Sequence, residues 1–328
     1  MNILITGGSG MLGSALIRLF HQQHQLRFIA RNADIARQLE RDYHAVAYLL
    51  DLNDRAALIE ACKGVDAIIH CAALSSPWGT YEQFFQANVA ATQNLVEAAR
   101  IQNVSCLVHI STTSVYFDYA DRWAITEKDA LARQWCNDYA KTKYLAERVV
   151  ENSPIKSIIL RPRGIFGPND RAIVPRVLSS VFRGQLLLPS GRNPVVDLTC
   201  VDNVAHAAML ACTQIEDLSH GEIFNISNGE PMPVEMLLQQ LLAALNHPVT
   251  IRRLPYRVLR QLLTMNEWIR QRLPGHPEPR LTRYSAGLLH HHQTLDITKA
   301  REILGYQPHV TINQGIEQYV RWFATQNL

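Results

Sequence analysis

Tyr139 and Lys143 are the residues whose types and spacing point most directly to chemistry. They lie four positions apart in a stretch with helical periodicity, so both side chains project from the same helical face. A phenol has a pKa of about 10 and is a poor acid or base at neutral pH. A lysine ammonium one turn away favours the phenolate. The pair therefore predicts proton transfer at an alcohol or carbonyl oxygen.

Four consecutive hydroxyl residues, Ser111 to Ser114, follow an apolar run that reads as a strand over 105–111. In a parallel sheet the C-terminal ends of the strands face the edge at which active sites open. A hydroxyl group at this edge can hold a substrate oxygen beside Tyr139. A Ser/Thr run can also be a simple turn or cap, so the prediction depends on the order of the motifs along the chain.

A glycine-rich loop follows the first apolar run directly and precedes a helical pattern. Glycine permits the sharp turn, lets a pyrophosphate approach the backbone, and allows close packing of helix and strand. The helix N-terminus offers free N–H groups and partial positive charge to phosphates. An ordinary strand–helix turn is the alternative. The predicted nucleotide contacts in this loop are Gly7, Gly10, Met11, Leu12 and Gly13.

Arg31 ends the second predicted strand, where dinucleotide folds that bind NAD carry an acidic residue. A guanidinium at this position can bind a ribose 2′-phosphate and stack on adenine. The position predicts NADP(H), with NAD as the alternative, unless Arg31 is only an exposed arginine at a strand end.

Two further strand ends are predicted to contact the nucleotide. Asp51 can accept a hydrogen bond from the adenine amino group, with the N–H of Leu52 nearby; the alternative is a helix N-cap near Asp54. Ala72 and Ala73 follow another strand, and their small side chains leave room for a cofactor to lie across the strand ends.

Strands alternate with helices through the first half of the chain, which predicts βαβ units and an α/β fold with a doubly wound, Rossmann-like parallel sheet. The predicted strands are 2–6, 26–30, 45–50, 66–70, 105–111, 156–161 and 222–227. The predicted helices are 11–23, 33–42, 54–62, 80–101, 137–152, 202–213, 233–246, 256–273 and 312–325.

Glycine and proline cluster after residue 163, which indicates a change of organisation. We expect a dinucleotide-binding domain over 1–163, to which 196–227 returns. Segments 164–195 and 228–328 are expected to form a smaller, mostly helical substrate-binding region.

Composition limits the function classes. The net charge of +3 over 328 residues is small and dispersed, which argues against nucleic acid binding. The six cysteines form no C-x-x-C pair and suggest buried free thiols. We see no signal peptide and no apolar run long enough to span a membrane, so a cytoplasmic location is expected. The run His290–His292 lacks an acidic or cysteine companion, and no metal site is predicted.

The chain resembles the extended short-chain dehydrogenase/reductase superfamily, also called the NAD-dependent epimerase/dehydratase family. The resemblance implies that Thr112 is the catalytic hydroxyl, three residues before Val115, and that Asn88 organises the active site. It also implies cofactor contacts from Ser111 and Pro162. The matching stretches are Thr6–Gly13, Ile68–Ala73, Asn88–Leu95, His109–Tyr116, Tyr139–Lys143, Arg161–Pro168 and Asp296–Pro308.

Within the superfamily, the chain is most similar to the 3β-hydroxysteroid dehydrogenase branch, which includes 2-alkyl-3-oxoalkanoate reductases. The stretches Ala72–Gly79, Arg161–Pro168, Val196–Val204 and Leu281–Tyr284 carry this similarity. It implies an oxidoreductase for an apolar secondary alcohol or ketone, sterol-like or a 3-oxo acid derivative.

Two alternatives are a nucleotide-sugar epimerase with the same Tyr/Lys pair and a non-catalytic NADP-sensing protein. Dehydration is disfavoured because Thr113 and Ser114 replace the Asp-Glu pair of the dehydratases.

The segment 254–273 is apolar with interspersed arginines. The pattern is typical of an ordinary amphipathic helix packed on the core. The alternative hypothesis is that the segment forms one wall of an apolar substrate pocket and offers a basic face to a membrane surface. Helices 80–101 and 137–152 often form a homodimer in the family, and the same pairing is an expectation here.

Overall fold

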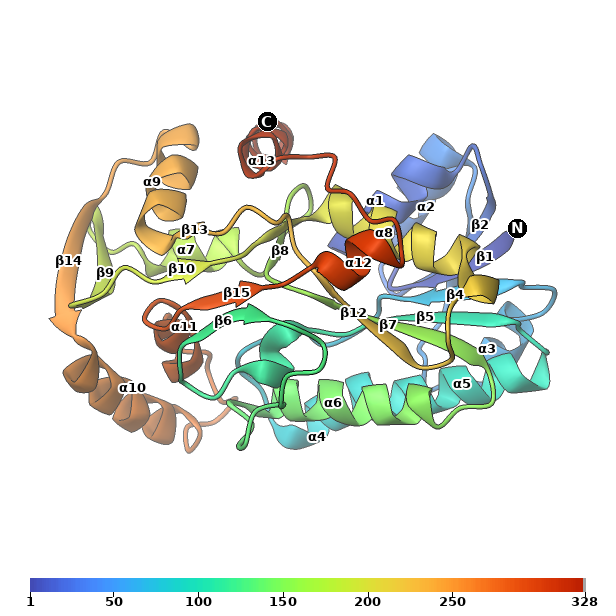
Figure 1. The fold of residues 1–328 in the computed structure, drawn as a ribbon, viewed down its shortest axis with the longest axis horizontal. Coiled ribbons are helices and arrows are strands. Elements are labelled where there is room, and N and C mark those ends of the chain that lie inside the picture. Colours follow the sequence, from blue (N-terminus) through green and yellow to red (C-terminus); the bar gives the residue numbers. More distant parts are fainter. Residues whose placement is uncertain (327–328) are drawn as a thin grey trace.

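The computed structural model describes residues 1–326, and a parallel sheet of seven strands lies at its centre (Figure 1). The strand order is β12-β7-β5-β4-β1-β2-β3, and every neighbouring pair is parallel. This order reverses direction between β1 and β4, which is where doubly wound folds bind ligands. The strands are β1 (Asn2–Thr6), β2 (Gln25–Ala30), β3 (Val46–Leu49), β4 (Ala67–His70), β5 (Cys106–Ile110), β7 (Lys156–Pro162) and β12 (Glu222–Ile226).

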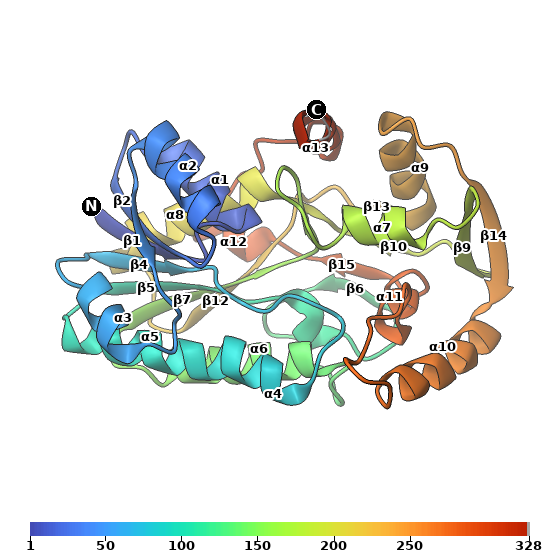
Figure 2. The ribbon, with the colours of Figure 1, turned by 180° about the vertical axis from the view of Figure 1, so that it is seen from behind.

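Helices cover both faces of the sheet, as Figures 1 and 2 show from opposite sides. Each face is sealed by its own apolar core, because parallel strands are buried on both sides. One face carries α1 (Met11–Phe20), α2 (Ala33–Tyr43), α8 (Val201–Thr213) and α12 (Thr298–Glu302). The other carries α3 (Arg55–Ala61), α4 (Tyr81–Phe84), α5 (Ala91–Ile101) and α6 (Asp138–Glu151).

The predicted α/β class and the seven predicted strands are confirmed, and each strand end lies within one residue of its expected position. The single helix predicted over 80–101 is wrong in one respect. A π-helical turn, η1 (Phe85–Ala90), separates α4 from α5 and contains Asn88. Such turns insert an extra residue into a helix and often occur at functional sites.

The remaining chain forms a smaller region at one end of the sheet (Figure 1). It contains the predicted helices and also eight strands that were not predicted from the sequence. Five of them have only two or three residues and show no readable periodicity, whereas β6, β9 and β14 are longer. Its helices are α7 (Val174–Ser180), α9 (Val234–Ala244), α10 (Tyr256–Arg270), α11 (Arg283–Leu288) and α13 (Ile312–Gln326), and a 3₁₀ turn, η3 (Ile215–Asp217), follows α8. Its strands are β6 (Arg122–Ile125), β8 (Ile165–Phe166), β9 (Gln185–Ser190), β10 (Val195–Val196), β11 (Thr199–Cys200), β13 (Met232–Pro233), β14 (Thr250–Pro255) and β15 (Gln293–Leu295).

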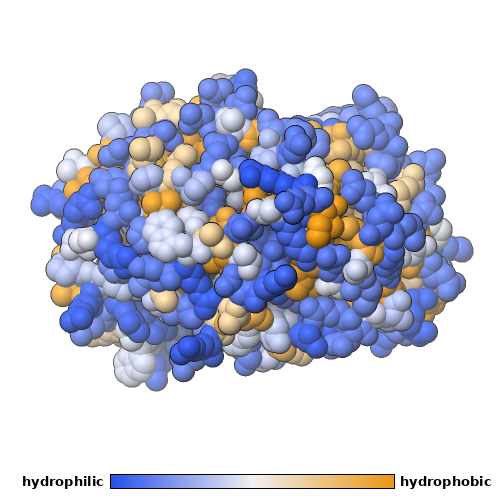
Figure 3. Space-filling view, in the orientation of Figure 1, coloured by the Kyte–Doolittle hydropathy of each residue, from blue (hydrophilic) through white to orange (hydrophobic). Residues whose placement is uncertain are grey.

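The face of the molecule in Figure 3 is mostly hydrophilic, with apolar side chains in small separate groups. Across residues 1–326, no helix is both long enough and apolar enough to cross a bilayer.

A buried ion pair fixes α6 on the sheet. The guanidinium of Arg161, on β7, donates to both carboxylate oxygens of Glu147, on α6, at 2.8 and 2.6 Å. The two side chains are 4% and 1% exposed, so the pair is removed from water and its geometry is bidentate. Arg161 also donates to the hydroxyl of Tyr116 at 2.7 Å, and Tyr116 donates to Asn225 on β12 at 3.1 Å.

We expect Glu147→Ala to lower the free energy of unfolding by about 3–5 kcal/mol, because it leaves the Arg161 guanidinium buried without its counter-charge. Chemical denaturation checks this value. The matched control is Asp34→Ala, which breaks the exposed Asp34–Arg37 pair and should change stability far less. Equal effects of the two substitutions would contradict the role of the buried pair.

Candidate active site

The glycine-rich loop joins β1 to α1 at the point where the strand order reverses. Gly7 has a φ of +70°, and a Cβ there would lie 2.9 Å from the Cα of Ala72. A Cβ on Gly13 would lie 2.3 Å from the carbonyl oxygen of Gly7, so α1 could not pack as it does. Gly10 is the N-cap of α1 and provides no capping side chain. Met11 and Leu12 begin the helix. The loop therefore presents backbone N–H groups, which suit a pyrophosphate.

Arg31 follows β2 at the same edge of the sheet and is exposed. Within residues 1–326 its guanidinium forms no ion pair, whereas the next residue, Asn32, caps α2 through its side chain. A free cation at the end of β2, the strand next to β1 and its glycine-rich loop, is suited to an additional phosphate.

The carboxylate of Asp51, which was predicted to contact the adenine, already accepts local hydrogen bonds. Its carboxylate accepts from the backbone and side-chain nitrogens of Asn53, both at 2.8 Å. The alternative N-cap role belongs to Asp54, which accepts from Ala57 at 3.1 Å. The carbonyl oxygen of Leu52 accepts a hydrogen bond from the side chain of Asn94 at 3.2 Å. The N–H group of Leu52, which was predicted to lie near the adenine, takes no part in this hydrogen bond.

Asn88 is buried and ties three elements together. Its side-chain oxygen accepts from the N–H of Leu74 at 2.8 Å, and its amide nitrogen donates to Thr142 on α6 at 3.1 Å. It thereby orients the loop after β4, which contains Ala72 and Ala73, relative to the helix that carries Tyr139. Asn88 therefore has the geometry of a residue that positions its neighbours.

Tyr139 stands at the start of α6 and is half-buried. The side chains of Ser75 and Thr112 lie next to its hydroxyl group. Burial raises the pKa of Tyr139 above the usual value, and the interactions with Ser75 and Thr112 oppose that shift. The structure thus places Thr112 beside Tyr139, as the family resemblance implies.

The hydroxyl cluster continues beyond Thr112. Thr112 donates to Ser114 at 3.0 Å and caps the 3₁₀ turn η2 (Thr113–Tyr116). The Ser114 hydroxyl shares a 2.7 Å hydrogen bond with the hydroxyl of Tyr284, on α11. Ser111 points elsewhere, because its hydroxyl donates to Glu147.

Lys143 is 2% exposed and lies one turn after Tyr139. Its ammonium donates to the carbonyl oxygen of Ile110 at 2.7 Å and lies 3.4 Å from the Nε2 atom of His109. Burial lowers the pKa of Lys143 to about 8, although Glu147 acts in the opposite direction. The sequence predicted that this lysine would favour the phenolate, but burial raises the pKa of Tyr139 in this structure, and Lys143 is not among the groups that shift it.

Pro162 ends β7 at the same edge and pairs in register with Ile226 of β12. A cavity of about 220 Å³ opens next to the start of α6, where Asn137 and Asp138 line it, and extends to α10 and α11 of the smaller region. Its walls include Trp78, Phe84, Tyr119, Cys136, Glu267 and Tyr284.

The sequence reasoning missed Ser75 and did not give Tyr284 a role. Both residues lie in stretches that resemble the family, but their contacts with Tyr139 and Ser114 could not be inferred from the sequence. The His290–His292 run packs locally, since His290 stacks on Tyr256 and His292 on Trp123. Among the residues that the structure describes, no group of three His, Cys, Asp or Glu side chains is placed to hold a metal.

Comparison with known proteins agrees with this geometry. Residues 3–227 match the model of the NAD dependent epimerase/dehydratase family. A 2-alkyl-3-oxoalkanoate reductase of Stenotrophomonas maltophilia is 34% identical, over 97% of this chain and 98% of the relative. The human sterol-4-alpha-carboxylate 3-dehydrogenase, decarboxylating, is 31% identical over 97% of this chain and 87% of its own length.

A UDP-glucuronic acid 4-epimerase from Bacillus cereus, solved with UDP-glucuronic acid and NAD, has the same fold. Its TM-score is 0.78 at 20% identity, covering 99% of this chain and 100% of that one. The chain belongs to the NAD dependent epimerase/dehydratase family. Its relatives at about a third identity include reductases and dehydrogenases of 3-oxo acids and sterols.

Proposed function

We propose that this protein is an NADP(H)-dependent oxidoreductase that interconverts an apolar secondary alcohol and its ketone. The observation that carries the proposal is the Tyr139 hydroxyl group, held by Thr112 and Ser75 at the carboxyl edge of the sheet. The names of the relatives support a substrate that is a 3-oxo acid or sterol-like carboxylic acid.

The proton chemistry falls to Tyr139. When bound, the nicotinamide dinucleotide supplies or accepts the two-electron hydride. In the reductive direction the protonated phenol donates its proton to the carbonyl oxygen of the substrate. Burial raises the pKa of Tyr139, which favours the protonated form that this step uses. In the oxidative direction Tyr139 accepts the proton from the alcohol.

Other residues of the site would bind and orient. Thr112 would hold the substrate oxygen beside the phenol. Lys143 would hold the ribose hydroxyl groups next to the nicotinamide, and Ser111 and Pro162 would border the cofactor. Gly7, Gly10 and Gly13 would hold the pyrophosphate, and Arg31 the 2′-phosphate of NADP(H). Asp51 and Leu52 would border the adenine, with Asp51 exchanging its contact to Asn53.

The epimerase alternative predicts a tightly retained oxidised cofactor, because the hydride returns to the same substrate molecule in each turnover. The fold is shared with the UDP-sugar epimerases at only 20% identity, which supports the fold and leaves the reaction open. A cofactor-sensing protein without turnover would not need the joined Thr112–Tyr139 hydroxyl groups.

We expect Tyr139→Phe to lower kcat by about 10²–10⁴-fold, because it removes the proton donor and retains the ring. Nicotinamide absorbance with a panel of apolar ketones measures the rate. Binding of NADPH, measured by fluorescence titration, should remain within a few-fold of wild type. Full activity in this variant would remove Tyr139 from the mechanism.

Arg31→Asp should weaken NADPH binding by about 10- to 100-fold and improve NADH binding, because a carboxylate repels the 2′-phosphate and accepts from a 2′-hydroxyl. Titration with both cofactors gives the ratio of the dissociation constants. Arg37→Asp is the matched control, since Arg37 lies on α2 and pairs locally with Asp34. A ratio that Arg31→Asp leaves unchanged would show that the protein does not select NADP through this residue.

A further inference from the structure

Arg163 is a buried arginine without a counter-ion. It is 6% exposed, and within residues 1–326 no carboxylate oxygen lies within salt-bridge distance of its guanidinium. Its Nε atom has no hydrogen-bond partner. Arg161, two residues earlier, is buried to the same degree but is paired in bidentate fashion with Glu147. An unpaired buried charge is costly, so its retention calls for a physical reason.

The surroundings of Arg163 connect it to the active site. It lies between β7 and β8, and its charge interacts with Tyr284 and Cys136, both of which line the cavity. Tyr284 and Cys136 each interact electrostatically with Tyr139 as well. The charge of Arg163 therefore acts on two groups that also surround the Tyr139 hydroxyl group.

Asp197 is the acidic group that faces Arg163. Its Oδ2 atom accepts from the N–H of Leu295 at 2.8 Å, and its Oδ1 atom has no partner. Burial raises the pKa of this carboxyl group and the charge of Arg163 opposes the shift, but the two side chains form no ion pair. The positive charge of Arg163 remains available to a ligand in the cavity.

We propose that Arg163 binds a carboxylate group of the substrate and so selects a 3-hydroxy or 3-oxo acid. This inference rests on the proposed function and adds the residue that would recognise the acid. A guanidinium offers a planar pair of donors that matches a carboxylate, and a bound anion would supply the counter-charge that the fold omits. The carboxylate of such an acid is two bonds from the reacting carbon, so both groups fit one small cavity.

The test compares a 2-alkyl-3-hydroxy acid with its methyl ester in the oxidative direction. The alcohol loses a hydride to NADP⁺ and a proton to Tyr139, which gives the ketone and NADPH. Wild type should prefer the acid, and Arg163→Met should lower the acid-to-ester ratio of kcat/KM by about 10- to 100-fold. Arg163→Lys should keep part of the preference, because it keeps the charge.

Arg163→Met should also leave the melting temperature at or above that of wild type, since no ion pair is lost, whereas Arg161→Met should lower it. An unchanged acid-to-ester ratio in a folded Arg163→Met protein would overturn the proposal. If neither compound reduces NADP⁺, the proposed function fails, and thermal-shift titration with the acid then decides the subsite. If the acid raises the melting temperature of the wild type but not that of Arg163→Met, the carboxylate subsite is supported. If the acid raises the melting temperature of both proteins, the subsite is rejected.

A separate observation concerns the outer face of α10. Val258, Leu262, Met265 and Ile269 follow one another at three- and four-residue spacing and are 43–58% exposed. Leu259, Leu263 and Glu267 form the opposite, buried face. An exposed apolar stripe of this kind on a helix marks an interaction surface.

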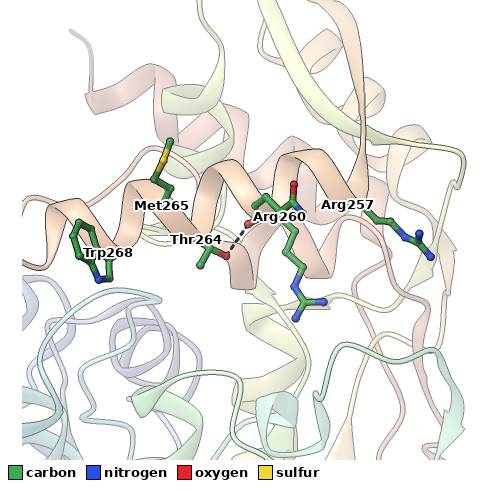
Figure 4. Close-up of a pocket in the computed structure, with 6 residues that line it drawn as sticks. Arg257, Arg260, Thr264, Met265 and Trp268 are labelled. Carbon is green, nitrogen blue, oxygen red and sulfur yellow. Dashed lines mark hydrogen bonds between the residues drawn. The ribbon is translucent and has the colours of Figure 1, made fainter.

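The flank of this stripe is cationic. Arg257, Arg260 and Trp268 border an open hollow of about 590 Å³ together with Met265, and Figure 4 shows these side chains along α10. Arg272 stacks on Trp268 at 3.8 Å. The acidic residues nearby are occupied, since Glu267 pairs with Arg283 and Glu278 with Arg176.

We infer that α10 docks on the surface of an anionic lipid bilayer. Its apolar stripe would enter the acyl boundary, and its arginines would contact the negative headgroups. Glu267 and Gln271, on the other side of the same helix, line the active-site cavity. Docking would therefore place the cavity beside the lipid phase, from which an apolar substrate can be taken.

Sedimentation with phosphatidylglycerol vesicles should pellet the full-length protein at least about tenfold more strongly than with phosphatidylcholine vesicles. Met265→Asp should weaken this binding by about tenfold, because it places a charge in the apolar stripe. Met236→Asp is the matched control, since Met236 is 48% exposed on α9 and away from the stripe. Equal pelleting with both lipids, no pelleting, or a dimer in light scattering that Met265→Asp dissociates would each overturn the proposal.

Discussion

The ion pair between Glu147 and Arg161 holds α6 on the sheet, and the geometry of the candidate site depends on it. It joins the middle of α6 to the end of β7, so the first turns of that helix lie over the carboxyl edge. Tyr139 and Lys143 occupy those turns. Because the pair is buried and bidentate, α6 has little freedom to slide, and the phenol stays beside Thr112.

A second constraint acts from the other side of the edge. Gly7 lies against Ala72, and Asn88 binds both the loop after β4 and Thr142 on α6. The proposed nucleotide-binding half and the proposed catalytic half are thus connected through one loop and one buried amide. The π-helical turn that carries Asn88 directs this side chain inward at a position where a regular helix would direct another residue.

Three buried cations near the site have different surroundings, and these differences suggest different tasks. Arg161 is fully paired and holds elements together. Lys143 is bound to a backbone carbonyl, and its pKa is lowered to about 8 by burial, which suits contact with neutral hydroxyl groups. Arg163 lacks a counter-ion, which suits a ligand that brings one. From Arg161 to Lys143 to Arg163, the protein itself supplies fewer partners for the buried positive charge.

Local sequence patterns determined the sheet, the glycine loop and the Tyr139/Lys143 helix, because strand and helix periodicities and i, i+4 spacing involve only near neighbours. Contacts between distant residues were decided by the tertiary structure. The hydroxyl group of Tyr284 is hydrogen-bonded to that of Ser114, 170 positions away, and the charge of Arg163 acts on Cys136 and Tyr284 only after folding. The pKa of Tyr139 shows the same limit: its spacing from Lys143 suggested a lowered value, whereas burial, which depends on the whole fold, raises it.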